Sequence, residues 1–103
     1  LRPRDLFLAR SFGIEATVTA GGTIGAQTIN KAAGTVNFGA GATTLVVTNS
    51  LVTTSSLVFA VVRTNDATAT IKNVVPAAGS FTITSTAAAT AETSVGFFVV
   101  QPD

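Results

Sequence analysis

The stretch from Gly34 to Arg63, GTVNFGAGATTLVVTNSLVTTSSLVFAVVR, decides the fold. Three apolar runs in it are separated by turn-forming residues, which predicts three strands with a sharp corner between each. The first run alternates through Val36 and Phe38, the second is Leu45 to Val47, and the third is Leu57 to Val62. β-branched and aromatic residues fill these runs, as a pleated, half-buried surface favours. The stretch therefore predicts a compact antiparallel β-structure, and it contains no obvious chemistry.

The segments on either side continue this pattern of short strands. Upstream, Ala16 to Ala20 and Thr23 to Ile29 predict two strands joined by a hairpin-like turn at Gly21-Gly22. Downstream, Ser80 to Thr84 and Thr93 to Val100 predict two more strands. About eight short strands at spacings near ten residues are typical of a sandwich or jelly roll. We therefore expect an all-β fold, an antiparallel β-sandwich or jelly roll with an extended N-terminal arm.

Two local patterns give definite expectations about burial. The unbroken apolar run Leu45 to Val47 predicts a strand that is covered on both faces. Between Thr68 and Val75, alternation places Ala69, Ile71 and Asn73 together on one side of a further strand.

Charged residues are scarce in this chain of 103 residues, whose length allows one domain. They make up 11% of the sequence, against about 25% in ordinary soluble proteins. Hydrophobic residues make up 47%. A soluble monomer needs charged surface, so two explanations remain: a surface coated with Thr and Ser, or a surface that lies against other protein. We favour the second, because the apolar excess and the charge deficit point the same way.

Charge and composition also argue against several classes of partner. A formal net charge of +1 is too small an excess of positive charge to indicate binding to nucleic acid or to an anionic membrane. No apolar run reaches the roughly 18 residues of a transmembrane helix, and the absence of Cys removes disulfides and thiolate metal sites. Leu1 to Arg4 does not resemble a signal peptide, because the apolar run after it is short and broken by Arg10. Since Leu1 is not Met, we expect that the natural start lies upstream.

The N-terminal segment, residues 1–15, differs in character from the sandwich domain that we predict over residues 16–103. It is the first strand of the domain's own core, an arm that docks on a neighbouring chain or, because it carries three Arg residues, an arm that binds nucleic acid. We predict docking, because the residues after it already supply enough inward side chains for a domain of this size. The apolar residues expected to bury in that contact are Leu6, Phe7, Leu8 and Phe12. The cationic residues expected at its rim are Arg2, Arg4 and Arg10.

The chain lacks the side chains that most enzyme chemistry uses. It contains no His, Cys, Tyr, Trp or Met, which removes the commonest general base, the thiol nucleophile and the soft metal ligands. Ser and Thr are plentiful, yet without a base none is an activated nucleophile. Gly21-Gly22 and Gly39-Ala40-Gly41 lack the Lys and the following helix of a phosphate loop. We therefore expect no enzyme, no cofactor and no metal site.

The interior carboxylates, Glu15, Asp66 and Glu92, do not suggest a glycosidase pair, which needs two carboxylates facing across a cleft. Asp66 follows Asn65 in a polar turn, so we predict a turn cap. Glu92 precedes a strand, so we predict an edge charge that blocks aggregation. The seven Phe residues mostly occupy alternating inward positions, which favours core packing over a sugar site.

From Gly34 onward, the amino-acid sequence resembles a recurrent module of tailed-bacteriophage structural proteins. The similar passages are GTVNFGAGATTLVVTNSLVTTSSLVFAVVRTNDATA, VVPAAGSFTIT and TAAATAETSVGFFVV, which together cover about residues 34–100. In that group the module lies near the carboxyl end of tail-fibre and other virion-surface proteins, and it closes with an apolar strand like Val95 to Val100. The resemblance implies a homotrimeric β-sandwich on the exterior of a phage particle.

Residues 1–30 do not match a fibre stalk, and a short chain with an apolar arm is more similar to a small capsid decoration or cement protein. We therefore expect a non-enzymatic virion protein that decorates or stabilises the capsid or forms part of a fibre. Its partners would be copies of itself and a major capsid, fibre or adaptor protein. The alternative is a receptor- or glycan-binding module at a tail-fibre tip. Its site would lie on the loops Thr64 to Ala67 or Ala87 to Glu92, the latter being too short and too poor in large apolar residues for a helix.

Overall fold

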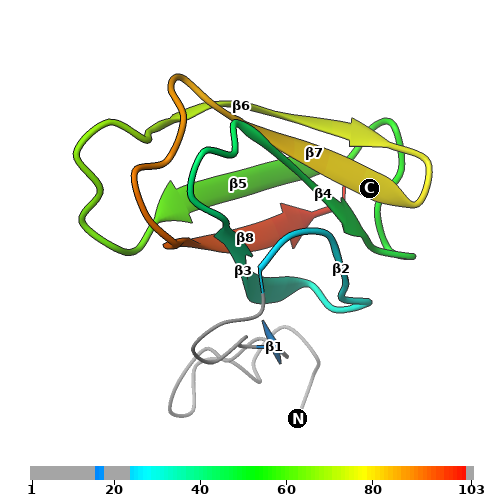
Figure 1. Cartoon of the computed structure of the whole chain (residues 1–103). Helices are drawn as coiled ribbons and strands as arrows, with labels where there is room; N and C mark the ends of the chain where they lie inside the picture. Colours follow the sequence, from blue (N-terminus) through cyan, green and yellow to red (C-terminus); the bar gives the residue numbers. More distant parts are fainter. Residues whose placement is uncertain (1–15, 18–23, 102–103) are drawn as a thin grey trace, which may run out of the picture.

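The computed structural model is an all-β sandwich in which two sheets lie face to face (Figure 1). The structure describes residues 16–17 and 24–101. These residues form eight strands and no helix, and none of them forms a helix that could span a membrane. The predicted docking segment, residues 1–15, lies outside the described residues.

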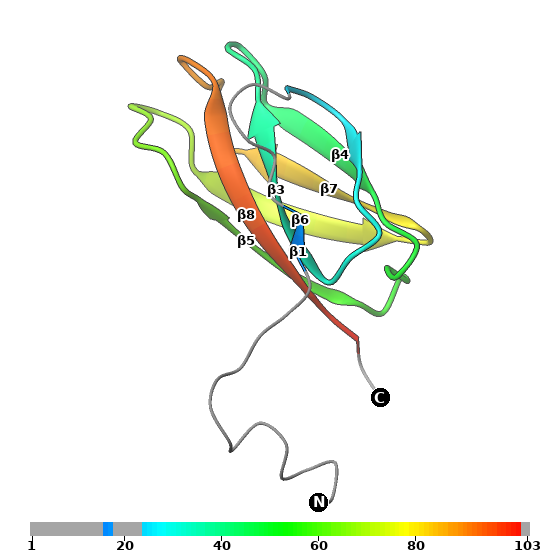
Figure 2. The ribbon, with the colours of Figure 1, turned by 90° about the horizontal axis from the view of Figure 1, so that it is seen from below.

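Each sheet has four strands, of which one is only two residues long. Sheet A has the order β1-β3-β8-β5 and sheet B the order β2-β4-β7-β6; Figure 2 shows sheet A from below. The strands of sheet A are β1 (Ala16–Thr17), β3 (Ala33–Phe38), β8 (Thr93–Val100) and β5 (Leu57–Val62). The strands of sheet B are β2 (Gln27–Thr28), β4 (Thr44–Thr48), β7 (Ser80–Ser85) and β6 (Ile71–Ala77).

The core lies between the sheets and is filled by strict alternation along the central strands. Phe81 and Ile83 of β7 are fully buried, as the sequence predicts, because successive residues of a strand point to opposite faces. The Phe81 ring meets Phe97 of the other sheet edge-on, with ring centroids 5.0 Å apart. The other large core side chains come from both sheets: Val36, Phe38, Leu45, Val47, Val95 and Val99.

The three strands predicted between Gly34 and Arg63 form at the expected places, but none of them pairs with another. β3 and β5 both pair antiparallel with β8, and β4 pairs antiparallel with β7. The corner after β3 carries the chain from sheet A to sheet B, and Gly41 in it adopts a φ of 85°, which only glycine adopts easily. The stretch is therefore divided between the two layers.

The predicted hairpin between Ala16–Ala20 and Thr23–Ile29 is wrong. β1 and β2 belong to different sheets, and each lies parallel to a later strand. Ala16 lies opposite Ala33, and Gln27 lies opposite Val47. Among the described residues, the pairings between the longer strands are antiparallel, whereas these two short strands and the isolated bridge between Ile24 and Asn37 are parallel.

Two burial expectations also fail for local reasons. Val46 is 44% exposed, so β4 is covered on one face only, because none of the described strands lies over the outer face of sheet B. In β6 a bulge between Ile71 and Asn73 interrupts the alternation, and a bulge adds a residue that reverses the facing of those after it. Val74 therefore packs against the core and Asn73 is exposed.

Candidate functional site

The outer faces of the two sheets carry different chemistry. Sheet B presents mainly threonines on its outer face, with valines between them. Its threonines are Thr44, Thr48, Thr82 and Thr84. Sheet A presents large apolar side chains instead, which we name the apolar face. They are Leu57, Phe59, Val61, Phe98 and Val100. The two explanations of the low charge each have a candidate surface: a threonine-rich face on sheet B and an apolar face on sheet A.

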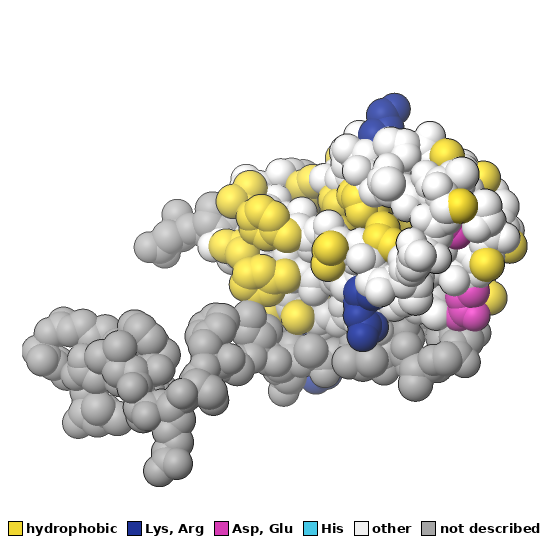
Figure 3. Space-filling model, turned by 90° about the vertical axis from the view of Figure 1, so that its left-hand side faces the viewer, with side chains coloured by type: hydrophobic (Ala, Val, Ile, Leu, Met, Phe, Trp, Pro, Cys, Tyr) yellow, Lys and Arg dark blue, Asp and Glu magenta, His cyan; other side chains and the backbone are white. Residues whose placement is uncertain are grey.

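Cross-strand pairing makes the apolar face continuous. Leu57 lies opposite Val100, and Phe59 lies opposite Phe98. The two phenyl rings stack with centroids 6.5 Å apart, although Phe59 is 58% exposed. Figure 3 shows hydrophobic side chains gathered on one side of the molecule. Grouped aromatic and aliphatic side chains of this kind mark interaction sites more often than isolated ones do.

A groove of about 480 Å³ runs along this face, and Gly96 is one of its lining residues. Gly96 of β8 pairs with both Val61 of β5 and Thr35 of β3, so its missing side chain leaves the hollow open. A Cβ at Gly96 would lie 3.3 Å from Cδ of Arg63. The aliphatic stem of Arg63 therefore closes one side of the groove.

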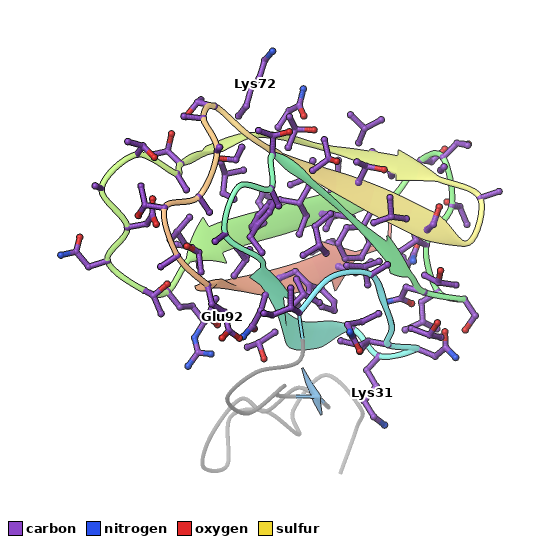
Figure 4. The ribbon with its side chains drawn as sticks, in the orientation of Figure 1. Lys31, Lys72 and Glu92 are labelled. Carbon is purple, nitrogen blue, oxygen red and sulfur yellow. The ribbon has the colours of Figure 1, made fainter. Side chains whose placement is uncertain are left out.

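The two exposed edge strands on the same side of the sandwich differ in their protection. β6, the edge of sheet B, carries Lys72, Pro76 and a bulge, which are features that prevent strands from pairing edge to edge. Lys72 points away from the sandwich (Figure 4). β5, the edge of sheet A, consists of LVFAVV and has no charge, proline or bulge. An unprotected apolar edge leaves its backbone N–H and C=O groups open to pairing with a strand of another chain.

At one end of the sandwich, Asp66 holds two loops together. Its Oδ2 accepts hydrogen bonds from the backbone N–H of Ala69 at 2.8 Å and of Thr68 at 3.0 Å. Its Oδ1 accepts from the backbone N–H of Thr90 at 3.0 Å and from its hydroxyl at 2.7 Å. The loops β5–β6 and β7–β8 lie side by side there (Figure 1). The predicted turn cap is confirmed, and it also bridges to the second loop.

These bonds hold the pKa of Asp66 well below its ordinary value, first because of the N–H groups of Ala69 and Thr68 and then because of the Thr90 hydroxyl. Folding therefore favours the carboxylate, so the contribution of Asp66 to stability is present above its unfolded pKa of about 4 and is lost as pH falls below that value.

We expect Asp66→Asn to lower the thermal midpoint at pH 7 and to flatten its decline between pH 5 and 2. Thermal unfolding across that range measures both. Asn65→Ala, an exposed neighbour, should change neither; an unaltered pH profile in Asp66→Asn would contradict this role.

Of the other carboxylates, the structure describes Glu92. Glu92 accepts a hydrogen bond from Nδ2 of Asn37 in β3, and it precedes β8, which lies inside sheet A. The prediction of an edge charge is therefore wrong for Glu92, and Figure 4 shows it at the loop end of the sheet. Glu15 lies outside the described residues. Among the residues that the structure describes, no cluster of acidic side chains could hold a metal ion.

The docking residues that the sequence predicts belong to the N-terminal segment, and all of them lie outside residues 16–17 and 24–101. They are Arg2, Arg4, Leu6, Phe7, Leu8, Arg10 and Phe12. The apolar face is not predicted from the sequence, because inward positions are expected for most of the seven Phe residues and nothing marks Phe59 and Phe98 as exceptions. One signal was present: Phe97 and Phe98 are adjacent in a strand, so only one of them can face inward.

Fold and site together define a small β-sandwich domain with one polar face and one apolar face. Comparison with protein-family models, curated proteins and solved structures gave no significant match to this chain. The apolar face is therefore the feature from which a function can be inferred.

Proposed function

We propose that this chain is a non-enzymatic structural protein of a virion exterior, where it assembles with copies of itself. The observation that supports the proposal is the apolar face, on which Leu57, Phe59 and Val61 project from an unprotected edge strand. Soluble monomers rarely leave such side chains grouped in water. Their burial against another chain would favour assembly by roughly 25 cal/mol per Å², before the cost of association.

The bacteriophage part of the proposal depends on the resemblance of residues 34–100. From this resemblance we propose that the chain forms a homotrimer and lies on the particle exterior. We also propose that its further partner is a capsid, fibre or adaptor protein. The proposal also includes the N-terminal docking arm and a jelly-roll subclass of sandwich. Two four-stranded sheets agree with a jelly roll, whereas the parallel pairings of β1 and β2 depart from an all-antiparallel one.

Val61→Asp and Val75→Asp are a matched pair of variants that test the interface. Both residues are valines on edge strands, and they are 64% and 54% exposed on the outer faces of sheets A and B. A carboxylate at position 61 must be desolvated when the apolar face is covered. We therefore expect Val61→Asp to raise the dissociation constant of self-association at least tenfold, about 1.4 kcal/mol, and Val75→Asp to leave it unchanged. Analytical ultracentrifugation measures both constants.

Native mass spectrometry of the wild-type chain would support the homotrimer if it gave three chain masses. A chain that stays monomeric at micromolar concentration and binds no other virion protein would overturn the proposal. Equal weakening by the two Asp variants would remove the interface from sheet A.

The adjacency of the two loops at Asp66 supports a second candidate, a receptor- or glycan-binding module at a fibre tip. Both predicted loops, Thr64 to Ala67 and Ala87 to Glu92, meet at one end of the sandwich. The hydrogen bonds to Asp66 are structural, so the exposed Asn65 is the cleaner position to change. Binding to a glycan array or to host cells that is lost in Asn65→Ala would support this function. The absence of binding by the wild-type chain would exclude it for the ligands tried.

A further inference from the structure

We infer that the groove over Gly96 receives residues 5–12 of a neighbouring copy of this chain. The inference depends on the proposed function, because it names the partner of the apolar face. Phe59, Val61 and Phe98 line the groove, with Arg63 at its side. The segment 5–12 has the sequence DLFLARSF, in which apolar residues predominate.

The area of the apolar face is too small to form a stable interface between two chains without a further segment. Leu57, Phe59, Val61 and Phe98 are exposed by between one and two thirds, so together they present on the order of 400 Å². One side of a stable interface takes about 800 Å². Two apolar faces in contact would therefore reach about half of that area. Leu6, Phe7, Leu8 and Phe12 supply the apolar surface that this contact lacks.

The direction of the chain favours the groove of a neighbour over the chain's own groove. Ala16 lies opposite Ala33, which lies opposite Phe98 near the end of β8. β1 is parallel to β3, so a segment that continued the line of β1 before Ala16 would leave sheet A at the end where β8 finishes. Gly96 and Arg63 lie toward the opposite end of sheet A, where β8 begins. Its own groove would require a reversal of the chain. A neighbour's groove is within reach, since fifteen extended residues span up to about 50 Å.

Arg63 gives the groove a charge that one residue of the segment matches. No acidic residue lines the groove, and Asp5 directly precedes Leu6. With Leu6 over Gly96, the carboxylate of Asp5 would come within reach of the guanidinium. Arg2 and Arg4 would then lie beyond the rim, in water. An exposed ion pair of this kind sets the direction of the segment more than its affinity.

Gly96→Val tests the groove without touching the core. Gly96 faces outward and does not have a positive φ, so a valine is compatible with the strand, and the atoms nearest to its Cβ belong to the flexible Arg63 side chain. We expect its self-association to weaken at least tenfold by analytical ultracentrifugation, with an unchanged or higher thermal midpoint. Thr82→Val, on the outer face of the central strand β7, is the matched control and should leave association unchanged.

Disulfide trapping tests the occupant directly, because the chain contains no Cys. A full chain with Leu8→Cys is mixed with an isotopically labelled full chain that carries Val61→Cys, and oxidised glutathione is added. We expect a covalent pair made of one labelled and one unlabelled chain. The same mixture with Val75→Cys in place of Val61→Cys should give several-fold less of that pair, since residue 75 faces outward on sheet B.

The outcomes separate this inference from the proposed function. A monomeric wild-type chain contradicts the proposed function. Self-association that is unaffected by Gly96→Val and by deletion of residues 1–12 leaves the proposed function standing and overturns the inference. A chain with both Leu8→Cys and Val61→Cys that forms its disulfide only within itself places the segment in its own groove, which also overturns the inference.

Discussion

Phe81→Ala is expected to destabilise the sandwich by about 3–5 kcal/mol, the range for truncating a buried phenyl ring. Phe81 is fully buried in the central strand β7, and its ring packs edge-on against Phe97 of the opposite sheet. Truncation leaves a cavity between the two layers that neither sheet can close by itself. Urea unfolding, monitored by circular dichroism at a concentration where the chain is monomeric, measures the loss. In a domain of this size, such a loss is a large part of the total stability.

Phe59→Ala is the matched control for this prediction. It removes the same ring from a strand, but from the outer face of sheet A, where Phe59 is largely exposed. Its loss should be about 1 kcal/mol or less, since little of the ring is removed from water in the monomer. Similar losses in both variants would mean that the inner and outer faces are not as the structure places them.

The contrast between these two phenylalanines also shows how far the sequence could predict the fold. Strand positions follow from local composition, so β3, β4, β5, β7 and β8 form close to the expected places. Inward facing was predictable where polar and apolar residues alternate, as around Phe81 and Ile83. In LVFAVV of β5 every residue is apolar, so alternation gives no sign of which face is inner.

Pairing could not be predicted from local pattern, because it depends on partners far along the chain. Ala33 pairs with Phe98, and Leu45 with Ile83. The placement of β8 between β3 and β5 is what makes β5 an edge strand and exposes Phe59 and Val61. The bulge in β6 is likewise a consequence of its pairing with β7, and it reversed the predicted facing of Asn73.

The sequence could predict the apolar character of the candidate site, but not its position on the outer face of sheet A. Low charge and high apolar content indicated a covered surface, and the structure presents an apolar face on sheet A. The residues that line the groove were not predictable, because Gly96 lies beside the side chain of Arg63, which is 33 positions earlier in the sequence. Glycine within an apolar strand is nevertheless a recognisable sign of a close approach by another chain or ligand.

Asn49→Ala is expected to cost about 2–4 kcal/mol, because it leaves buried polar groups without their partners. Asn49 follows β4 and is fully buried. Its Nδ2 donates to the carbonyl of Lys31 at 2.8 Å, and its Oδ1 accepts from the backbone N–H of Leu51 at 2.9 Å. Its own N–H donates to the carbonyl of Gly79. The side chain therefore ties the turn after β4 to the segment before β3, beside the β6–β7 turn.

Asn30→Ala separates this effect from the loss of any asparagine near the same turn. Asn30 is exposed, and its Oδ1 accepts one hydrogen bond, from the backbone N–H of Ser50 at 2.9 Å. When that bond is lost, water can replace it, so the expected cost is below about 1 kcal/mol. Urea unfolding of both variants gives the comparison. If Asn30→Ala cost as much as Asn49→Ala, burial of Asn49 would not explain its contribution, and the turn would depend on both asparagines equally.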